Sequence, residues 1–358
     1  MTTVDDAVTI GSLFSGYGGL CELAAAPLLG GRVSWHCDVD PAASKVLAHH
    51  WPGTPNLGDI TKANFSTVPP VRILTGGFPC TDVSAAGRQA GIRPGTRSGL
   101  WSVMRHATAV LRPELVLIEN VRGLLHAPAH SDVEPCPWCL GDDRGVPALR
   151  ALGAVLADLA DLGYDAAWCG LPASAVGAPH TRYRIFIAAT DTHREPRSQR
   201  RQPAPGQAPG RQALGEPGRR RLAPAAHTES DRQPAWGQPG GDPAQRPLPD
   251  RDRVPALAWG EYEPAIRRWE HVTGRPAPMP TVPGRRGNTV LNPALPEWMM
   301  GLPTGHITAV PGLSRADMLR LAGNGVVWQQ ATAALGYLLP LLGITTHAPD
   351  LGAQREAA

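Results

Sequence analysis

Residues 8–29 read VTIGSLFSGYGGLCELAAAPLL. They predict a short apolar strand (Val8–Phe14), a glycine-rich turn (Ser15–Gly19) and a helix (Leu20–Leu29). Glycines at such a turn let the backbone come close to a ligand. The cluster is not the G-x-G-x-x-G dinucleotide fingerprint, so a plain tight turn and a ligand-binding turn both remain open at this point.

Strand and helix patterns alternate through the first half of the chain. The further predicted strands are Arg32–Cys37, Arg72–Thr75, Leu115–Ile118 and Arg184–Ala189, and the further predicted helices are Pro41–His50, Leu149–Leu162 and a final one from about Val326 to Leu342. Leu115–Ile118 is wholly apolar, as buried parallel strands are. The pattern predicts an α/β fold with a doubly wound, mostly parallel sheet.

Composition changes sharply at residue 191. Residues 191–250 contain no Val, Ile or Phe and are rich in Pro, Arg, Gln and Gly. Such a segment buries too little apolar surface to offset its ordering entropy, so it is predicted to be a disordered linker.

Charge and hydrophobicity place few limits on partners. The 358-residue chain carries a net charge of +3, and its only lysines are Lys45 and Lys62. A nucleic-acid partner is therefore permitted but not required. Neither a long apolar run nor a secretory signal occurs, so we expect no membrane span and a cytoplasmic location.

Acidic residues follow the second predicted strand and the unit after it. Asp38 stands where nucleoside-binding sheets hold a ribose. Asp40 precedes Pro41 and a helical run, which is typical of an N-cap. Asp59 is either a ligand of an adenine amino group or an ordinary turn residue. Together the glycine-rich turn and these acids predict an adenosine-type ligand.

A thiol and a carboxyl group follow the third and fourth strands. Cys80 ends the run GGFPC, and Glu119 closes the apolar strand Leu115–Ile118. If these strands are neighbours, both side chains face the crevice beyond the carboxyl ends of the sheet. The pair suits cytosine chemistry, because a thiolate adds to carbon 6 while a carboxyl group takes up charge at ring nitrogen 3.

These motifs resemble the DNA (cytosine-5)-methyltransferases, in particular their phage and actinobacterial branch. The resemblance covers roughly residues 8–190 and 290–340. The motifs are LFSGYGG (13–19), GGFPC (76–80), ENV (119–121), RYR (182–184), EWMMGLP (297–303) and GNGV (323–326). The resemblance implies a Rossmann-like methyltransferase fold, S-adenosylmethionine as cofactor and double-stranded DNA as substrate, with the target cytosine flipped out of the duplex.

The resemblance also implies roles for individual residues. The catalytic set would be Cys80, Glu119, Arg182 and Arg184. The cofactor set would be Phe14, Gly16, Gly18, Asp38, Asp59, Ile60, Pro79, Leu100, Asn324 and Val326. A loop closing over DNA would contain Ser84, Gly87, Gln89 and Arg97. His180 departs from the family, which carries Gln at that position.

Composition and the resemblance together predict the following division of the chain. Residues 1–190 form the catalytic domain with an insertion at 126–147, 191–250 the linker, 251–315 a small target-recognition region, 316–345 a segment returning to the catalytic domain, and 346–358 a tail. In the recognition region Arg285, Arg286, Trp259 and Trp269 are candidates for DNA contact, although exposed Arg and core Trp are commoner explanations.

Two questions stay open at the level of sequence. His126, His130, Cys136 and Cys139 have spacing compatible with a structural zinc site, or they lie in a solvent loop with reduced thiols. The rival functions are an RNA cytosine-5 methyltransferase and a non-catalytic DNA-binding regulator. A cytosine methyltransferase would associate with the nucleoid and could act beside a restriction endonuclease.

Overall fold

The computed structural model describes residues 8–79, 100–125, 151–193, 259–284 and 287–347. Contacts divide the chain into two units, Met1–Glu195 with Ala258–Ala358, and Pro196–Leu257. Every described residue belongs to the first unit. The predicted insertion 126–147 and almost all of the predicted linker 191–250 lie outside the described residues.

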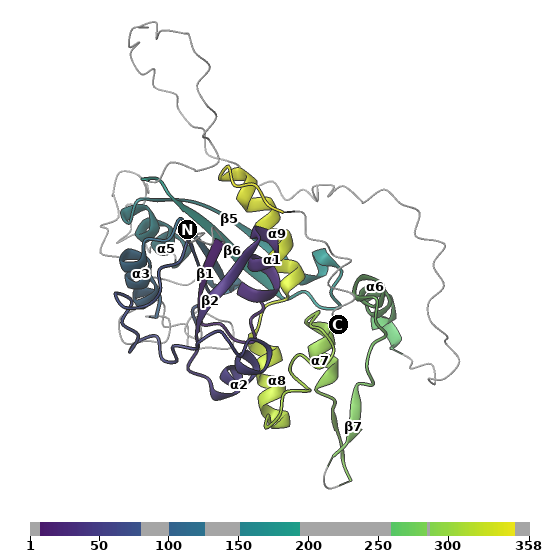
Figure 1. Ribbon diagram of the computed structural model, residues 1–358. Coiled ribbons are helices and arrows are strands. Elements are labelled where there is room, and N and C mark those ends of the chain that lie inside the picture. Colours follow the sequence, from purple (N-terminus) through teal and green to yellow (C-terminus); the bar gives the residue numbers. More distant parts are fainter. Residues whose placement is uncertain (1–7, 80–99, 126–150, 194–258, 285–286, 348–358) are drawn as a thin grey trace, which may run out of the picture. The chain divides into compact units, whose positions relative to one another are not determined.

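A six-stranded sheet forms the centre of this unit (Figure 1). Its strand order is β2-β1-β3-β4-β6-β5. The strands are β1 (Val8–Leu13), β2 (Gly31–Cys37), β3 (Ile73–Gly76), β4 (Leu115–Val121), β5 (Tyr164–Pro172) and β6 (Tyr183–Asp191). Strands β1 to β4 run parallel to one another, and β6 is antiparallel to both β4 and β5. The predicted α/β fold with a mostly parallel sheet is confirmed.

Helices cover both faces of the sheet (Figure 1). On one face, α3 (Leu100–Leu111) and α5 (Ala151–Asp161) share a hydrophobic core with β3 and β4. On the other, α1 (Ala26–Leu29) and α9 (Trp328–Leu341) pack against β1, β4 and β6. Residues from both the N-terminal and the C-terminal part of the chain therefore form this second hydrophobic core.

A third hydrophobic cluster lies beside the sheet and draws on both halves of the chain. It joins Tyr17 and α2 (Pro41–His50) to the C-terminal helices. Those helices are α6 (Glu263–Thr273), α7 (Ala294–Met299) and α8 (Arg315–Asn324). A short hairpin, β7 (Thr281–Pro283) with β8 (Thr289–Leu291), leads into α7.

The predicted elements differ from the observed ones at several places. The first helix opens as a π-helix, Cys21–Ala25, because the Gly18 carbonyl accepts hydrogen bonds from both Glu22 N and Leu23 N. The edge strand β5 was not predicted, since YDAAWCGLP lacks a clear alternation of apolar and polar residues. Helices α3, α6, α7 and α8 were also not predicted.

The described helices include none that is both long and apolar enough to cross a bilayer.

Candidate active site

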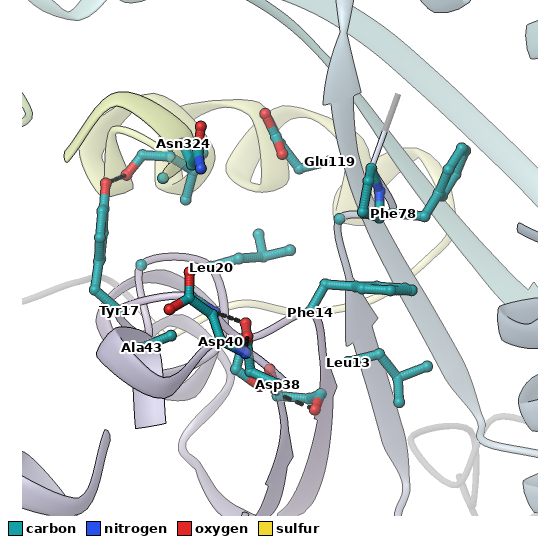
Figure 2. Close-up of a pocket in the computed structure, with 18 of the residues that line it drawn as sticks. Leu13, Phe14, Tyr17, Leu20, Asp38, Asp40, Ala43, Phe78, Glu119 and Asn324 are labelled. Atoms are coloured by element: carbon teal, nitrogen blue, oxygen red, sulfur yellow. Dashed lines mark hydrogen bonds between the residues drawn. The ribbon is translucent and has the colours of Figure 1, made fainter. Parts of the chain in front are cut away.

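A cavity of about 930 Å³ lies at the carboxyl ends of β1, β2, β3 and β4 (Figure 2). This is the crevice where open parallel sheets bind ligands. Its volume is at the upper end of those found for small-molecule pockets. Most of the predicted cofactor residues line it, namely Phe14, Gly16, Asp38, Asp59, Ile60, Pro79, Leu100, Asn324 and Val326.

Asp38 is held at the glycine-rich turn by two backbone groups. Gly16 N donates to Asp38 Oδ2 at 2.7 Å, and Asp40 N donates to Asp38 Oδ1 at 2.9 Å. Burial raises the pKa of the Asp38 carboxyl above its ordinary value, although these hydrogen bonds oppose the shift. Each carboxylate oxygen retains a lone pair, so Asp38 can still accept hydrogen bonds from a diol.

Asp40 has the capping role that its sequence position predicts. Its Oδ1 accepts a hydrogen bond from Ala42 N at 2.8 Å, and Pro41 occupies the first turn of α2. The Arg320 guanidinium also contacts Asp40 and holds the pKa of that carboxyl below its usual range. Arg320 lines the cavity from α8, so this ion pair joins two walls of the pocket.

Asp59 forms a local turn while it lines the cavity. Its Oδ1 accepts hydrogen bonds from Thr61 N at 3.0 Å and Thr61 Oγ1 at 2.8 Å. The turn interpretation is therefore confirmed. The adenine role stays a prediction.

Phe14 adopts a left-handed backbone conformation at the end of β1. Its φ is +53°, and Arg112 is the only other non-glycine residue with positive φ in the described part of the chain. Such a conformation costs an L-residue on the order of 1–2 kcal/mol and tends to occur at functional sites. A hydrogen bond from Phe14 N to Cys37 O, 2.8 Å long, holds the backbone in this conformation. The Phe14 residue then lines the cavity.

Glu119 enters the cavity from the end of β4, on the side opposite Asp38 in Figure 2. Arg184 Nε lies 2.7 Å from Glu119 Oε1, and both side chains are mostly buried. Burial raises the pKa of Glu119, while the charges of Arg184 and Arg182 lower it, and burial is the larger effect. This carboxyl therefore takes up a proton more readily than a free glutamate.

The end of β3 passes close to Glu119. A side chain at Gly77 would place its Cβ only 3.1 Å from Glu119 Oε2. Asn120 is buried and donates through Nδ2 to Phe78 O at 3.2 Å. Since β3 and β4 are parallel neighbours, these contacts bring Pro79 and Glu119 into one cavity.

Two predicted site residues do not line the cavity. Gly18 has φ of +83°, and a Cβ there would meet the Trp51 ring at 2.7 Å. Arg182 donates through Nη2 to Gly323 O at 3.0 Å and also contacts Gly325 O. Arg184, by contrast, both lines the cavity and pairs with Glu119.

Several predicted residues lie outside the described part of the chain. They are Cys80, the loop residues Ser84, Gly87, Gln89 and Arg97, the zinc candidates His126, His130, Cys136 and Cys139, and the arginines Arg285 and Arg286. Among the tryptophans, Trp269 is fully buried and donates through Nε1 to Trp298 O at 2.8 Å, which confirms its core role.

Other lining residues had not been singled out from the sequence. Tyr17, Asn120 and Arg320 are three of them that make polar contacts through their side chains. Tyr17 carried a signal, because it is the only large residue between the glycines of the turn. No sequence signal marked Arg320, because its partner Asp40 is 280 residues away.

Comparisons with known proteins agree with this geometry. The family model described as C-5 cytosine-specific DNA methylase matches residues 8–208. Type II methyltransferase M2.BsuMI of Bacillus subtilis (strain 168) is 33% identical over 183 residues, which are 50% of this chain and 41% of that protein. Type II methyltransferase M.NlaIV of Neisseria lactamica is 31% identical over 182 residues, 50% of this chain and 40% of that protein.

The chain thus matches about two fifths of the length of these relatives. Among solved structures, one described as a DNA modification methyltransferase encoded within a prophage (E. coli) has a TM-score of 0.49 and 17% identity, with 93% of this chain and 100% of that chain covered. No conclusion follows from a likeness of that degree.

Proposed function

The chain belongs to the C-5 cytosine-specific DNA methylase family, and from this premise we propose that it methylates carbon 5 of cytosine in double-stranded DNA with S-adenosylmethionine. The observation that carries the proposal is the meeting of Asp38 and the buried Glu119–Arg184 pair in one cavity. A nucleoside ligand and a reacting base both need such groups, and the cavity volume of about 930 Å³ accommodates the two together.

The residues present fit the cofactor. Asp38 would accept hydrogen bonds from the ribose hydroxyls, and Asp59 with Ile60 would meet the adenine. Asn324 and Val326 would close the pocket from the C-terminal segment. S-Adenosylmethionine supplies a methyl group bonded to a positively charged sulfur.

In the proposed reaction, the Cys80 thiolate bonds to carbon 6 of the flipped cytosine. Cys80 is joined to Pro79, which lines the cavity. Glu119 holds or donates a proton at ring nitrogen 3, and its raised pKa favours this role. The addition makes carbon 5 nucleophilic enough to take the methyl group. A water molecule then takes the carbon 5 proton, the bond to carbon 6 breaks to release Cys80 as a thiolate, and the proton at ring nitrogen 3 returns to Glu119, which restores the aromatic ring.

Arg184 would act beside Glu119. Its pairing with Glu119 Oε1 orients the carboxyl group, and its charge faces the same cavity. Arg182 Nη2 donates to backbone carbonyls of residues 323 and 325, so we assign Arg182 to holding that segment and leave contact with the cytosine to Arg184.

The test is methyl transfer from tritiated S-adenosylmethionine to duplex DNA, with bisulfite sequencing to locate the product. We expect the full chain to label DNA and not tRNA, and the Cys80→Ala variant to lose all turnover while keeping its thermal unfolding temperature. Turnover by that variant would rule out Cys80 as the nucleophile, and label in tRNA alone would favour an RNA methyltransferase.

A further inference from the structure

Tyr17 connects the glycine-rich turn to a segment more than 300 residues away in sequence. Its side chain is buried, and its hydroxyl donates to Val326 O at 2.7 Å (Figure 2). Burial raises the pKa of this hydroxyl, so it remains a hydrogen-bond donor. The cavity wall on one side contains Gly16 and Gly19, and on the other Asn324 and Val326.

The ring of Tyr17 is enclosed by glycine on both sides. A Cβ at Gly19 would lie 2.7 Å from Tyr17 Cε2 and 2.9 Å from Val326 Cγ1. A Cβ at Gly325 would overlap the Tyr17 ring outright. The two backbone segments therefore approach each other around this one aromatic ring, and glycine is required where they do.

The backbone of Tyr17 is held from a different direction. His306 Nε2 donates to Tyr17 O at 2.9 Å, and the His306 ring stacks on His50 with centroids 4.2 Å apart. The loop that carries His306 is fixed by the buried Glu297 carboxylate, which accepts from Gly305 N, Ile307 N and Thr308 N at 2.7–2.8 Å. Main chain and side chain of Tyr17 thus contact two separate parts of the C-terminal half.

We propose that Tyr17 is a positioning residue for the cofactor pocket: it holds Val326, and with it Asn324, in the pocket wall and so determines cofactor affinity. This rests on the proposed function in so far as the cofactor is S-adenosylmethionine. Arg182 holds the same segment through Gly323 O and Gly325 O. Loss of the Tyr17 hydroxyl therefore loosens the wall without detaching it.

Tyr164 provides a matched control. It is also buried, and its hydroxyl also donates to a backbone carbonyl at 2.7 Å, that of Pro113, away from the cavity. Tyr17→Phe and Tyr164→Phe each remove one buried hydroxyl and leave one carbonyl without its donor. Similar losses of stability are expected from both, which separates a general structural effect from an effect on the pocket.

The first measurement is the affinity of each full-length variant for S-adenosylmethionine by calorimetry, with KM and kcat beside it. Tyr17→Phe is expected to raise Kd and KM about five- to tenfold with kcat at saturation unchanged within about twofold, and Tyr164→Phe to leave all three within about twofold. Equal losses of affinity in both variants, or none in either, would overturn the proposal.

The second measurement needs no cofactor. Hydrogen exchange of peptides covering residues 321–327 should be faster in Tyr17→Phe than in the unmodified chain and Tyr164→Phe. If the unmodified chain does not bind S-adenosylmethionine, the proposed function fails, and exchange alone decides the positioning role. Unchanged exchange in Tyr17→Phe would then refute it.

Discussion

At the scale of single residues, the cavity depends on a carboxyl group that is buried beside two arginines. Glu119 pairs directly with Arg184, whereas Arg182 is bound to the backbone at residues 323 and 325. A buried carboxylate without such a partner would carry a large desolvation cost. The pairing with Arg184 keeps the Glu119 side chain in place, while burial raises the pKa of its carboxyl group. A group that donates a proton to a base needs such a raised pKa.

Glu119→Gln removes the acidic proton and keeps the side-chain volume. If Glu119 acts at ring nitrogen 3, kcat for methyl transfer should fall by about 10²- to 10⁴-fold while the Kd for S-adenosylmethionine changes little. Glu114→Gln is the control, because Glu114 pairs with Arg72 at 2.9 Å near the opposite end of β4. Steady-state labelling of DNA checks both, and an active Glu119→Gln variant would contradict the assignment.

His306 should make stability depend on pH. Burial lowers its pKa from 6.5 to about 4, and its other neighbours include His49 and His50. His306 is therefore protonated near pH 6.5 in the unfolded chain and only near pH 4 in the folded chain. The free energy of unfolding should fall as pH drops through this window, by up to roughly 3 kcal/mol.

The check is urea unfolding at pH 7.5 and pH 5. His306→Gln, which keeps a side-chain N–H donor but cannot titrate, should lose most of this pH dependence. An equally steep fall in that variant would assign the effect to other groups.

At the scale of elements, the site exists because β3 and β4 are parallel neighbours. Their carboxyl ends reach the same edge of the sheet. There the Asn120 side chain of β4 donates a hydrogen bond to Phe78 O, just after β3. On one face of the same sheet, α9 packs its buried side against β5 and β6. The helix that follows Val326 therefore anchors the C-terminal wall of the cavity.

Shortening single side chains on α9 to alanine should show which face of this helix contributes the anchoring. Leu338 is fully buried, and Leu341 is 61% exposed on the same helix. Leu338→Ala is expected to lower the free energy of unfolding by about 2–5 kcal/mol, and Leu341→Ala by less than about 0.5 kcal/mol. Chemical denaturation measures both, and equal losses would contradict the packing of α9.

At the scale of the whole molecule, distant parts of the chain meet in shared cores. The cluster around Trp269 and Trp298 includes Tyr17 and residues of α2, although a segment of composition unsuited to folding separates them in sequence. We therefore expect apolar burial on both sides of that segment to be independent of it.

Deletion of residues 195–248 tests this independence. The shortened chain should remain folded, with a thermal unfolding temperature within a few degrees of the full chain and an unchanged affinity for S-adenosylmethionine. Circular dichroism and calorimetry provide the two measurements. Loss of soluble protein would show that the deleted segment contributes to the fold.

Much of the N-terminal half could be predicted from local patterns. The strands near β1, β2, β3, β4 and β6 follow from short apolar runs, and the capping role of Asp40 follows from the proline after it. The edge strand β5 was missed because its stability comes from tertiary packing more than from periodicity. Helices α3 and α7 were missed as well. Helices α6 and α8 were missed although local signals exist, namely the apolar spacing of Ile266 and Trp269 in α6 and the Ser314–Asp317 capping box that begins α8.

By itself, the sequence determined the fold class and the identity of the chemical groups. Turn glycines, strand-end acids and apolar strands are local features, and each restricts the backbone within a few residues of itself. Only the tertiary structure decided which arginine pairs with Glu119 and that Tyr17 reaches Val326. Such pairings join residues from 65 to 309 positions apart, so they are set by the packing of the sheet and the C-terminal helices, which no local pattern records.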